Sequence, residues 1–172
     1  SRDFFSSTGG QINGAWEPRS AGSTLKPFTY LLALEKGYTA ASILPDIPSE
    51  YVSSAGAYQP VNFDRRCYGP VTIRRALATS LNIPAVRLLK KVGGPRRLHH
   101  LLESDFHFSS LEGNGDSYGL GLTIGNAEVR LLELTNAYAC LARLGKWLPY
   151  RFTSEGKPQP KTVFDAQNAW II

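Results

Sequence analysis

A serine and a lysine three positions apart, at the start of a predicted helix, constrain the fold of this chain most. The pair is Ser23 and Lys26, and Pro27 follows directly, a residue that helices tolerate only in their first turn. We therefore expect the helix to begin at Ser23, whose side chain is the predicted N-cap, and to stop at Gly37. Residues three apart on a helix are neighbours on one face, so the Lys26 amine can lie over the Ser23 hydroxyl.

This spacing suits nucleophilic chemistry. A serine hydroxyl becomes a strong nucleophile when a nearby base removes its proton, and a neutral lysine can be that base. The pKa of Lys26 would have to fall from ~10.4 by about 3 units, a change of ~4 kcal/mol that burial can supply. The positive end of the helix also favours an alkoxide and an oxyanion at Ser23.

A second polar motif lies at the corner between two predicted helices. Ser80 supplies a hydroxyl that can relay a proton to a leaving amine, and Asn82 supplies an amide that can hold a substrate peptide group. Taken alone, both motifs have ordinary interpretations, because N-cap serines with exposed lysines and polar turns are common. The two motifs together favour a shared catalytic site.

The spacing of apolar and helix-breaking residues predicts a mainly α-helical chain. We expect helices over residues 23–36, 71–79, 84–92 and 95–103, a longest helix capped by Asn126 and closed by Gly145, and a last helix capped by Asp165. The apolar stripe of the longest helix is predicted to contain Leu131, Leu134, Ala137, Tyr138, Leu141 and Leu144. Residues 38–70 hold four prolines and predict irregular structure, residues 113–125 predict a glycine-rich loop, and residues 147–152 are a candidate strand.

Several other kinds of site are excluded or left open. Three glycines between residues 119 and 125 do not match a dinucleotide-binding loop, because the third comes one residue late and no strand clearly precedes them. Cys67 and Cys140 lack the spacing of a zinc site, so no metal or cofactor is expected. Cys140 is predicted to be a buried free thiol, although pairing of the two cysteines stays open.

The three histidines do not complete a catalytic triad with Ser23. We expect surface or partly buried positions for His99, His100 and His107.

Composition indicates one folded domain without a nucleic-acid site. Of the 172 residues, 42% are hydrophobic and 19% charged, which suits a globular core. The net charge of +5 comes from scattered basic pairs, an arrangement that favours a solvated surface over a nucleic-acid site. No apolar run is long enough to span a membrane, and the chain contains no methionine and no signal peptide. We expect it to be part of a longer protein, so localisation does not follow from these absences.

Three segments closely resemble the transpeptidase region of class A penicillin-binding proteins, and most of all their 1C branch. The segments are Arg19-Ser20-Ala21-Gly22-Ser23-Thr24-Leu25-Lys26-Pro27-Phe28, Thr79-Ser80-Leu81-Asn82-Ile83-Pro84-Ala85-Val86 and Leu134-Thr135-Asn136-Ala137-Tyr138-Ala139. The resemblance extends from about Asp3 to Arg143, and Ala21 replaces the proline expected before Gly22.

This resemblance implies a fold and its boundaries. Residues 1–172 would be a partial transpeptidase domain, the helical part of the α/β fold that penicillin-binding proteins share with serine β-lactamases. The early strands and the later Lys-Thr-Gly strand would be missing. Lys161-Thr162-Val163 is not a substitute, because it lacks the glycine and comes too early.

The resemblance also implies an activity, that of an acyl-serine D,D-transpeptidase which cross-links peptidoglycan stem peptides. Ser23 would attack the penultimate D-alanine carbonyl, Lys26 would be the base, Ser80 the proton relay and Asn82 a substrate contact. β-Lactams would acylate Ser23. The parent protein would be anchored at the periplasmic face of the bacterial inner membrane, would also carry a glycosyltransferase domain and would not bind nucleic acid.

Two alternatives share the acylation step. A D-alanyl carboxypeptidase or serine β-lactamase would pass the acyl group to water, and a β-lactam sensor or scaffold would hold it without turnover. The chain by itself is expected to be weak or inactive in catalysis. It is also expected to self-associate through apolar surface that the missing sheet would cover.

Overall fold

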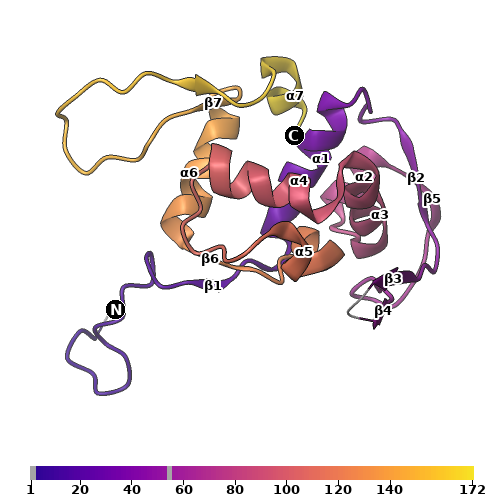
Figure 1. Cartoon of the computed structure of the whole chain (residues 1–172), viewed down its shortest axis with the longest axis horizontal. Helices are drawn as coiled ribbons and strands as arrows, with labels where there is room; N and C mark the ends of the chain where they lie inside the picture. The colour runs from indigo at the N-terminus through magenta and orange to yellow at the C-terminus, as the bar shows by residue number, and fades with distance from the viewer. Residues whose placement is uncertain (1–2, 54–55) are drawn as a thin grey trace.

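The computed structural model describes residues 3–53 and 56–172 and is 43% helical and 13% strand, as the sequence predicts for a mainly α-helical chain (Figure 1). The helices are α1 (Lys26–Glu35), α2 (Ile73–Ala78), α3 (Asn82–Val92), α4 (Gly94–His100), α5 (Gly115–Tyr118), α6 (Leu131–Ala142) and α7 (Ala166–Ile171). Shorter helical turns are η1 (Gly22–Leu25), η2 (Leu101–Asp105) and η3 (Gly119–Ile124).

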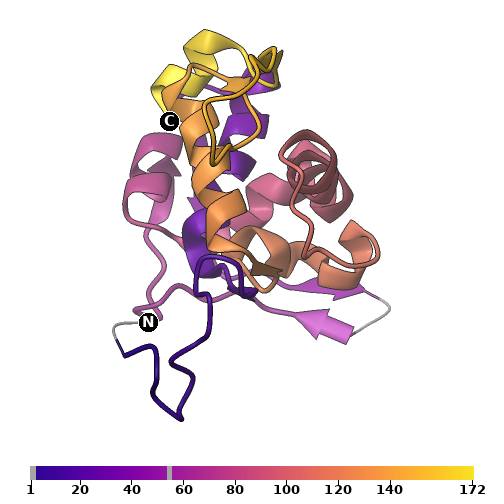
Figure 2. The same ribbon diagram turned by 90° about the vertical axis from the view of Figure 1, so that its left-hand side faces the viewer.

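Within residues 3–53 and 56–172 the strands form four antiparallel pairs, each of two short strands. The pairs are β1 (Arg19–Ser20) with β6 (Glu128–Val129), β2 (Ile43–Asp46) with β5 (Gly69–Thr72), β3 (Tyr51–Ser53) with β4 (Gly56–Tyr58), and β7 (Lys146–Trp147) with β8 (Lys161–Thr162). The β2–β5 pair and the β3–β4 hairpin extend along one side of the helical body (Figures 1 and 2).

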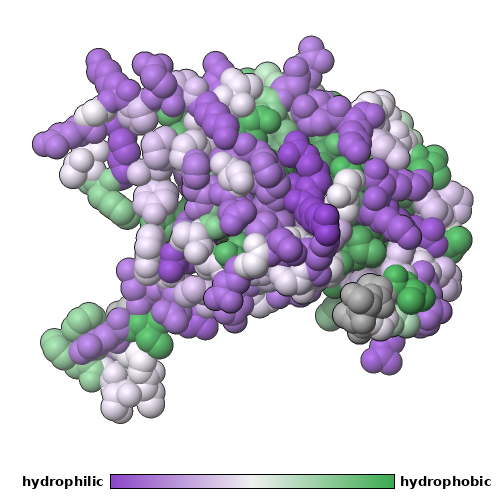
Figure 3. Space-filling view, viewed as in Figure 1, coloured by the Kyte–Doolittle hydropathy of each residue, from purple (hydrophilic) through white to green (hydrophobic). Residues whose placement is uncertain are grey.

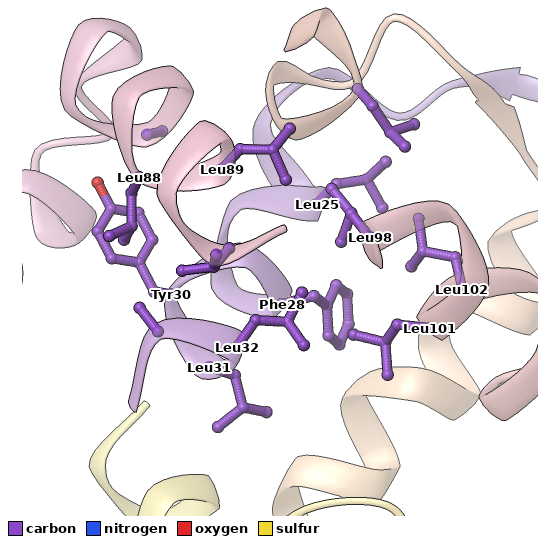
Figure 4. Close-up of a cluster of buried hydrophobic side chains, with 14 of the residues drawn as sticks. Leu25, Phe28, Tyr30, Leu31, Leu32, Leu88, Leu89, Leu98, Leu101 and Leu102 are labelled. Carbon is purple, nitrogen blue, oxygen red and sulfur yellow. The ribbon is translucent and has the colours of Figure 1, made fainter. Parts of the chain in front are cut away.

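Helix α1 is the centre of the hydrophobic core. Phe28, Tyr30 and Leu31 are fully buried, and leucines of α3, α4 and η2 surround them (Figure 4). The Phe28 ring contacts Phe106 and Tyr138, with ring centroids 5.2 and 5.4 Å away. Because side chains pack against α1 on several sides, these contacts fix the position of the start of the helix.

The turn that leads into α1 is tied to a distant part of the chain. β1 pairs with β6, the Ala21 amide donates to the Ala127 carbonyl at 3.0 Å, and the Gly22 amide donates to the Gly125 carbonyl at 3.2 Å. A Cβ built on Gly125 would lie 1.6 Å from the Gly22 carbonyl oxygen. Only glycine allows these two backbones to approach so closely.

Two predictions about irregular segments are wrong. Residues 38–70 contain two strand pairs, apart from residues 54–55, which lie outside the described part. Pro45 and Pro70 face each other in the β2–β5 ladder, where each strand has a free edge on which a missing N–H costs little. Residues 113–125 form α5 and η3 instead of a loop, because Leu122 is fully buried and draws the segment into the core.

The predicted caps are partly wrong. Ser23 lies inside η1, so it caps neither η1 nor α1. The N-cap positions are Ala21 for η1 and Leu25 for α1, and neither makes a side-chain capping bond. Asn126 does not cap α6, because β6 intervenes and its amide donates to the Tyr118 carbonyl. Asp165 is confirmed as the cap of α7, where it accepts from the Gln167 amide at 2.8 Å.

The stripe of α6 is also different from the prediction. Ala137 is buried, but Leu131, Tyr138 and Leu144 are 56%, 37% and 45% exposed. Polar Glu133 is buried instead, where its carboxylate accepts from the Ser109 hydroxyl and amide. An internal hydrogen-bond network has replaced an apolar contact that hydrophobic periodicity predicted.

Other expectations have clear outcomes. The helices over 71–79, 84–92 and 95–103 are present as α2, α3 and α4 with η2. Of the candidate strand at 147–152, only Trp147 lies in a strand, as the last residue of β7. Cys140 is a buried free thiol and Cys67 an exposed one, so they are not paired. His99 is buried against Tyr118, contrary to the expectation of partial exposure.

In the described part of the chain, every helix is too short or too polar to cross a bilayer.

We predict that Gly125→Ala lowers the free energy of unfolding by about 3 kcal/mol, because the new methyl group meets the Gly22 backbone at a positive φ. Urea denaturation followed by circular dichroism measures the change. Gly14→Ala is the matched control, since a Cβ there has open space and should change stability by less than about 0.5 kcal/mol. Equal stability of the two variants would contradict the close approach of η1 and residue 125.

Candidate active site

Ser23 lies in η1, the turn that precedes α1. Gly22 before it has a φ of 56°, a left-handed conformation that favours glycine and turns the chain into η1. The turn is held from outside by the Tyr138 hydroxyl, which donates to the Thr24 carbonyl at 2.8 Å. The Ser23 side chain is exposed. The structure therefore presents the Ser23 hydroxyl to solvent on an anchored turn.

Lys26 is the first residue of α1, and only 1% of it is exposed. Its amine donates to the Ser80 carbonyl at 2.6 Å, to the Ser80 hydroxyl at 2.9 Å and to the Asn82 side-chain oxygen at 2.7 Å. An ammonium has three donors, so these three bonds satisfy it fully. The pairing of the two motifs that the sequence predicts is thus present at Lys26.

Burial changes the protonation of this amine. All three partners of Lys26 are uncharged, so desolvation of the ammonium lowers the pKa of Lys26 from 10.5 to about 8. At pH 7 about a tenth of the lysine is therefore neutral. This is the protonation state that a general base requires.

Ser80 forms the corner between α2 and α3. Its φ is 55°, unusual for a residue with a side chain. The strained corner is held by two backbone bonds, from the Ser80 amide to the Leu77 carbonyl at 3.0 Å and from the Leu81 amide to the Ala76 carbonyl at 2.9 Å. In this conformation both the carbonyl and the hydroxyl of Ser80 point to the Lys26 amine. Such strain is common at functional sites.

Asn82 begins α3 and is oriented from two sides. Its side-chain oxygen accepts from Lys26, and its side-chain nitrogen donates to the Val61 carbonyl at 2.8 Å. Because an amide has one acceptor end and one donor end, the bond to Val61 ensures that oxygen faces the lysine. The amide nitrogen keeps a second hydrogen for a ligand.

The structure thus brings together three of the four predicted residues, Lys26, Ser80 and Asn82. Ser23 lies one turn from Lys26, but in the part of the chain that the structure describes no hydrogen bond joins their side chains. The two hydroxyls, Ser23 and Ser80, are both exposed. A hollow of about 260 Å³ adjoins Ser80, and its other lining residues are Asn62, Phe63, Asp64, Tyr68, Arg75, Thr79 and Leu81.

One residue behind the site was missed by sequence analysis. Asn62 is 2% exposed, and its side-chain oxygen accepts from the backbone amides of Asn82 and Ile83 at 2.8 and 3.2 Å. A single asparagine beside prolines carries no sequence signal that separates it from a turn residue. Its role depends on a contact across 20 residues.

The residues described, 3–53 and 56–172, contain no group of three or more histidine, cysteine, aspartate or glutamate side chains placed to hold a metal ion.

Comparison with known proteins gives the chain a family. Residues 8–172 match the family model of the penicillin binding protein transpeptidase domain. The chain is 37% identical to Penicillin-binding protein 1C of Escherichia coli (strain K12) over 155 residues, which are 90% of this chain and 19% of that protein. It is 33% identical to Penicillin-binding protein 1A of Pseudomonas aeruginosa over 135 residues, or 77% of this chain and 16% of that protein. The chain spans less than a fifth of the length of these relatives.

Solved structures agree with this assignment. The crystal structure of Penicillin-Binding Protein 1A from Haemophilus influenzae matches with a TM-score of 0.72 at 30% identity, covering 90% of this chain and 24% of that one. The PonA1 protein from Mycobacterium tuberculosis in complex with penicillin V matches with a TM-score of 0.75 at 22% identity, covering 92% and 46%. The second likeness concerns the fold alone.

We predict that the low pKa of Lys26 makes stability depend on pH in the alkaline range. The unfolded lysine, with a pKa of 10.5, binds more protons between pH 8 and 10.5 than the folded one, with a pKa of about 8. Lys26 therefore contributes a rise of about 3 kcal/mol to the free energy of unfolding across this window. Above pH 9 the Cys140 thiol contributes a fall, because burial raises its pKa from 9.0 to about 11.

Denaturation midpoints measured from pH 7 to 10.5 test this prediction. The difference in stability between the unaltered protein and Lys26→Met should grow with pH, whereas Lys36→Met, at an exposed lysine just after α1, should follow the unaltered protein. The same pH dependence in the Lys26→Met protein would show that another group is responsible.

Proposed function

Because the chain belongs to the transpeptidase domain family of penicillin-binding proteins, we propose that it carries the acyl-serine site of a D,D-transpeptidase that cross-links peptidoglycan stem peptides. The observation that carries this proposal is the buried Lys26 amine, bound to Ser80 and Asn82 one turn after an exposed Ser23. A base, a proton relay and an amide donor are thereby assembled beside a nucleophile on a helix start.

The proposed reaction has two balanced steps. In the first, neutral Lys26 takes the proton of Ser23, and the serine oxygen bonds to the carbonyl carbon of the penultimate D-alanine. The bond from this carbon to the nitrogen of the terminal D-alanine breaks, and the proton passes through the Ser80 hydroxyl to that nitrogen. In the second step an amine of a neighbouring stem attacks the ester, its proton returns by the same route, and Ser23 is released.

The residues have separate parts in this scheme. Ser80 is 2.9 Å from the Lys26 nitrogen, a distance over which a hydrogen bond can carry a proton. The second amide hydrogen of Asn82 would hold a peptide carbonyl of the substrate. The start of α1 supplies partial positive charge near the oxyanion. β-Lactams would enter at the first step, because opening of their ring also leaves an acyl group on Ser23.

The whole protein is the context of the proposal. We propose that it acts at the periplasmic face of a bacterial inner membrane, to which it is anchored, and that it also has glycosyltransferase activity. Residues 1–172 contain Lys161-Thr162-Val163 but no Lys-Thr-Gly sequence, so the chain alone should cross-link weakly or not at all. Losing one donor of an oxyanion site costs a factor of ~10² to 10³ in rate.

We predict that Ser23 is the residue acylated by penicillin. Incubation of the full-length protein with a labelled penicillin, followed by intact-mass measurement and peptide mapping, should place the adduct on Ser23. Ser23→Ala should abolish labelling. Ser7→Ala, which removes an exposed hydroxyl earlier in the chain, should label as the unaltered protein does. An adduct that survives Ser23→Ala at full yield would sink the assignment.

The lifetime of the acyl-enzyme formed with a stem peptide identifies the acceptor. A transpeptidase should release a stem-peptide acyl group faster when an acceptor amine is added, with cross-linked product as the readout. Fast release in water alone would indicate a carboxypeptidase or β-lactamase. Absence of release with either acceptor would indicate a β-lactam sensor.

We also propose that this chain, expressed alone, self-associates. Polar residues predominate on the face in Figure 3, yet Leu131 of α6, Leu144 just after it, and Trp170 and Ile171 of α7 are large apolar side chains between 45% and 79% exposed. Helices α6 and α7 are in contact, so these side chains lie on neighbouring elements. Exposed apolar side chains on neighbouring elements favour association with a second copy.

Sedimentation velocity at low and high concentration tests this prediction. The sedimentation coefficient should rise with concentration, and Trp170→Lys should reduce the rise. Phe63→Lys is the matched control, since Phe63 is fully exposed in the loop after β4 and should leave the rise unchanged. A strictly monomeric protein at every concentration would contradict the proposal.

A further inference from the structure

Behind the Lys26 cluster lies a second, fully buried layer of polar groups that the proposed mechanism does not use. Its centre is Asp46, the last residue of β2, which is 0% exposed. Both carboxylate oxygens accept from the side-chain nitrogen of Asn62, at 2.9 and 3.0 Å, and one also accepts from the Tyr68 amide at 2.9 Å. An isolated carboxylate is expensive to bury, so these bonds compensate for its desolvation.

Asn62 connects this carboxylate to the site. Its nitrogen end is taken by Asp46 and by the Arg66 carbonyl at 2.8 Å, which forces its oxygen end toward the start of α3. There the oxygen accepts from the amides of Asn82 and Ile83. These are among the first amides of α3, which have no partner within the helix, so Asn62 acts as a cap supplied from another part of the chain.

The same segment holds Asn82 by its side chain as well. The Val61 carbonyl accepts from the Asn82 side-chain nitrogen, and the neighbouring Asn62 accepts from the Asn82 backbone amide. Two bonds of 2.8 Å from adjacent residues therefore fix both the position and the orientation of Asn82. Through its side-chain oxygen this orientation is transmitted to the Lys26 amine.

The chemical identity of Asn62 has an electrical consequence. Asparagine and aspartate cap helices about equally well. An aspartate at position 62 would place a negative charge on the start of α3, next to residues that bind the Lys26 amine. Such a charge would favour the ammonium form, whereas the neutral amide leaves the positive end of the helix uncompensated.

We propose that Asn62, held by the buried Asp46, is a positioning residue that orients Asn82 against the Lys26 amine and keeps negative charge away from it. The part of this proposal that concerns acylation rests on the proposed function, but the part that concerns Lys26 does not.

Other ionisable groups surround the cluster. They are Tyr30 on α1, Arg75 on α2, Asp64 and Tyr68 in the segment between β4 and β5, and Tyr138 on α6. Burial, and then the charge of Asp46, raise the pKa of the Tyr30 hydroxyl, so Tyr30 stays neutral in the range of interest. In the described part of the chain none of the five donates to or accepts from the Lys26 amine, which leaves Asn82 and Ser80 as its direct environment.

An exchange of the two side chains, Asp46→Asn with Asn62→Asp, is the sharpest test. The exchanged pair keeps composition and net charge and can remake the bonds to the amides of Tyr68, Asn82 and Ile83 and one of the two bonds between residues 46 and 62. The bond to the Arg66 carbonyl is lost. The negative charge moves from Asp46 to the start of α3. We expect the pKa of Lys26 to rise by about one unit, corresponding to a tenfold tighter hold on its proton.

Two readouts follow this shift in the full-length protein. Heteronuclear NMR of lysines labelled at the ε-carbon measures the pKa of Lys26 directly, with Lys26→Met to assign the signal. In the pH profile of acylation by penicillin, the midpoint on the acidic side should move to higher pH by the same amount. At high pH the rate should recover toward that of the unaltered protein. Asn114→Asp, the same substitution at the cap of α5, is the control and should move neither midpoint.

Asn62→Ala separates positioning from charge. It removes the cap without adding charge, so the acylation rate at the alkaline plateau should fall at least tenfold in protein that is still folded by circular dichroism. An unchanged rate in folded Asn62→Ala, an unmoved Lys26 midpoint in the exchange variant, or failure of the exchange variant to fold would each overturn the proposal. If the unaltered protein is not acylated at all, the proposed function fails, and the NMR midpoint still decides on Asn62.

Discussion

The structure of the site depends on the hydrogen bonds of one buried amine. Lys26 is covered by the core that forms around α1, so its nitrogen must find its partners within the protein. It finds them at the corner between α2 and α3, where Ser80 and Asn82 supply three oxygens. Because no partner is a carboxylate, no negative charge opposes the effect of burial, which lowers the pKa of the amine. Stability and reactivity are therefore set by the same three contacts.

These contacts form only when elements that lie far apart in the sequence are placed accurately relative to one another. The turn η1 and helix α1 bring the serine and the lysine, the strained corner brings Ser80, and α3 brings Asn82. The segment before α3, backed by the end of β2, then fixes Asn82 from outside through Val61 and Asn62. The penicillin-binding site proposed here is thus a meeting point of helix ends, with its supporting polar groups in the hairpin region.

The sequence predicts the helices and the reactive motifs well, because both are local. Pro27 and Gly37 bracket α1, and the Ser-x-x-Lys and Ser-x-Asn spacings name three residues that the structure brings into contact. The failures are all non-local. Asn126 resembles a cap, but its side chain donates to the Tyr118 carbonyl, and Ser23 lies inside η1. The strand pair that contains Pro45 forms although the sequence predicts irregular structure there.

Burial was also hard to predict where polar groups are satisfied internally. Glu133 and Asp46 are buried because each has several donors around it, and neither set of donors is adjacent in sequence. Hydrophobic periodicity places such residues on the surface. The sequence does not predict the polar layer behind the site for the same reason. The role of Asn62 depends on its contacts with Asp46 and with the start of α3, which are distant in sequence.

The tie between η1 and residues 125–129 sets an order of events during synthesis. The Ser20 hydroxyl and the Gly22 amide bond to the Gly125 carbonyl, more than a hundred residues further along the chain. Closure of so long a loop is slow and comes after local helices have formed. As the chain leaves the ribosome, Lys26 can therefore meet Ser80 and Asn82 long before the turn that carries Ser23 is anchored. The Ser23 turn is the last part of the proposed site to take its place, so an unfinished chain holds Lys26 before Ser23 is fixed beside it.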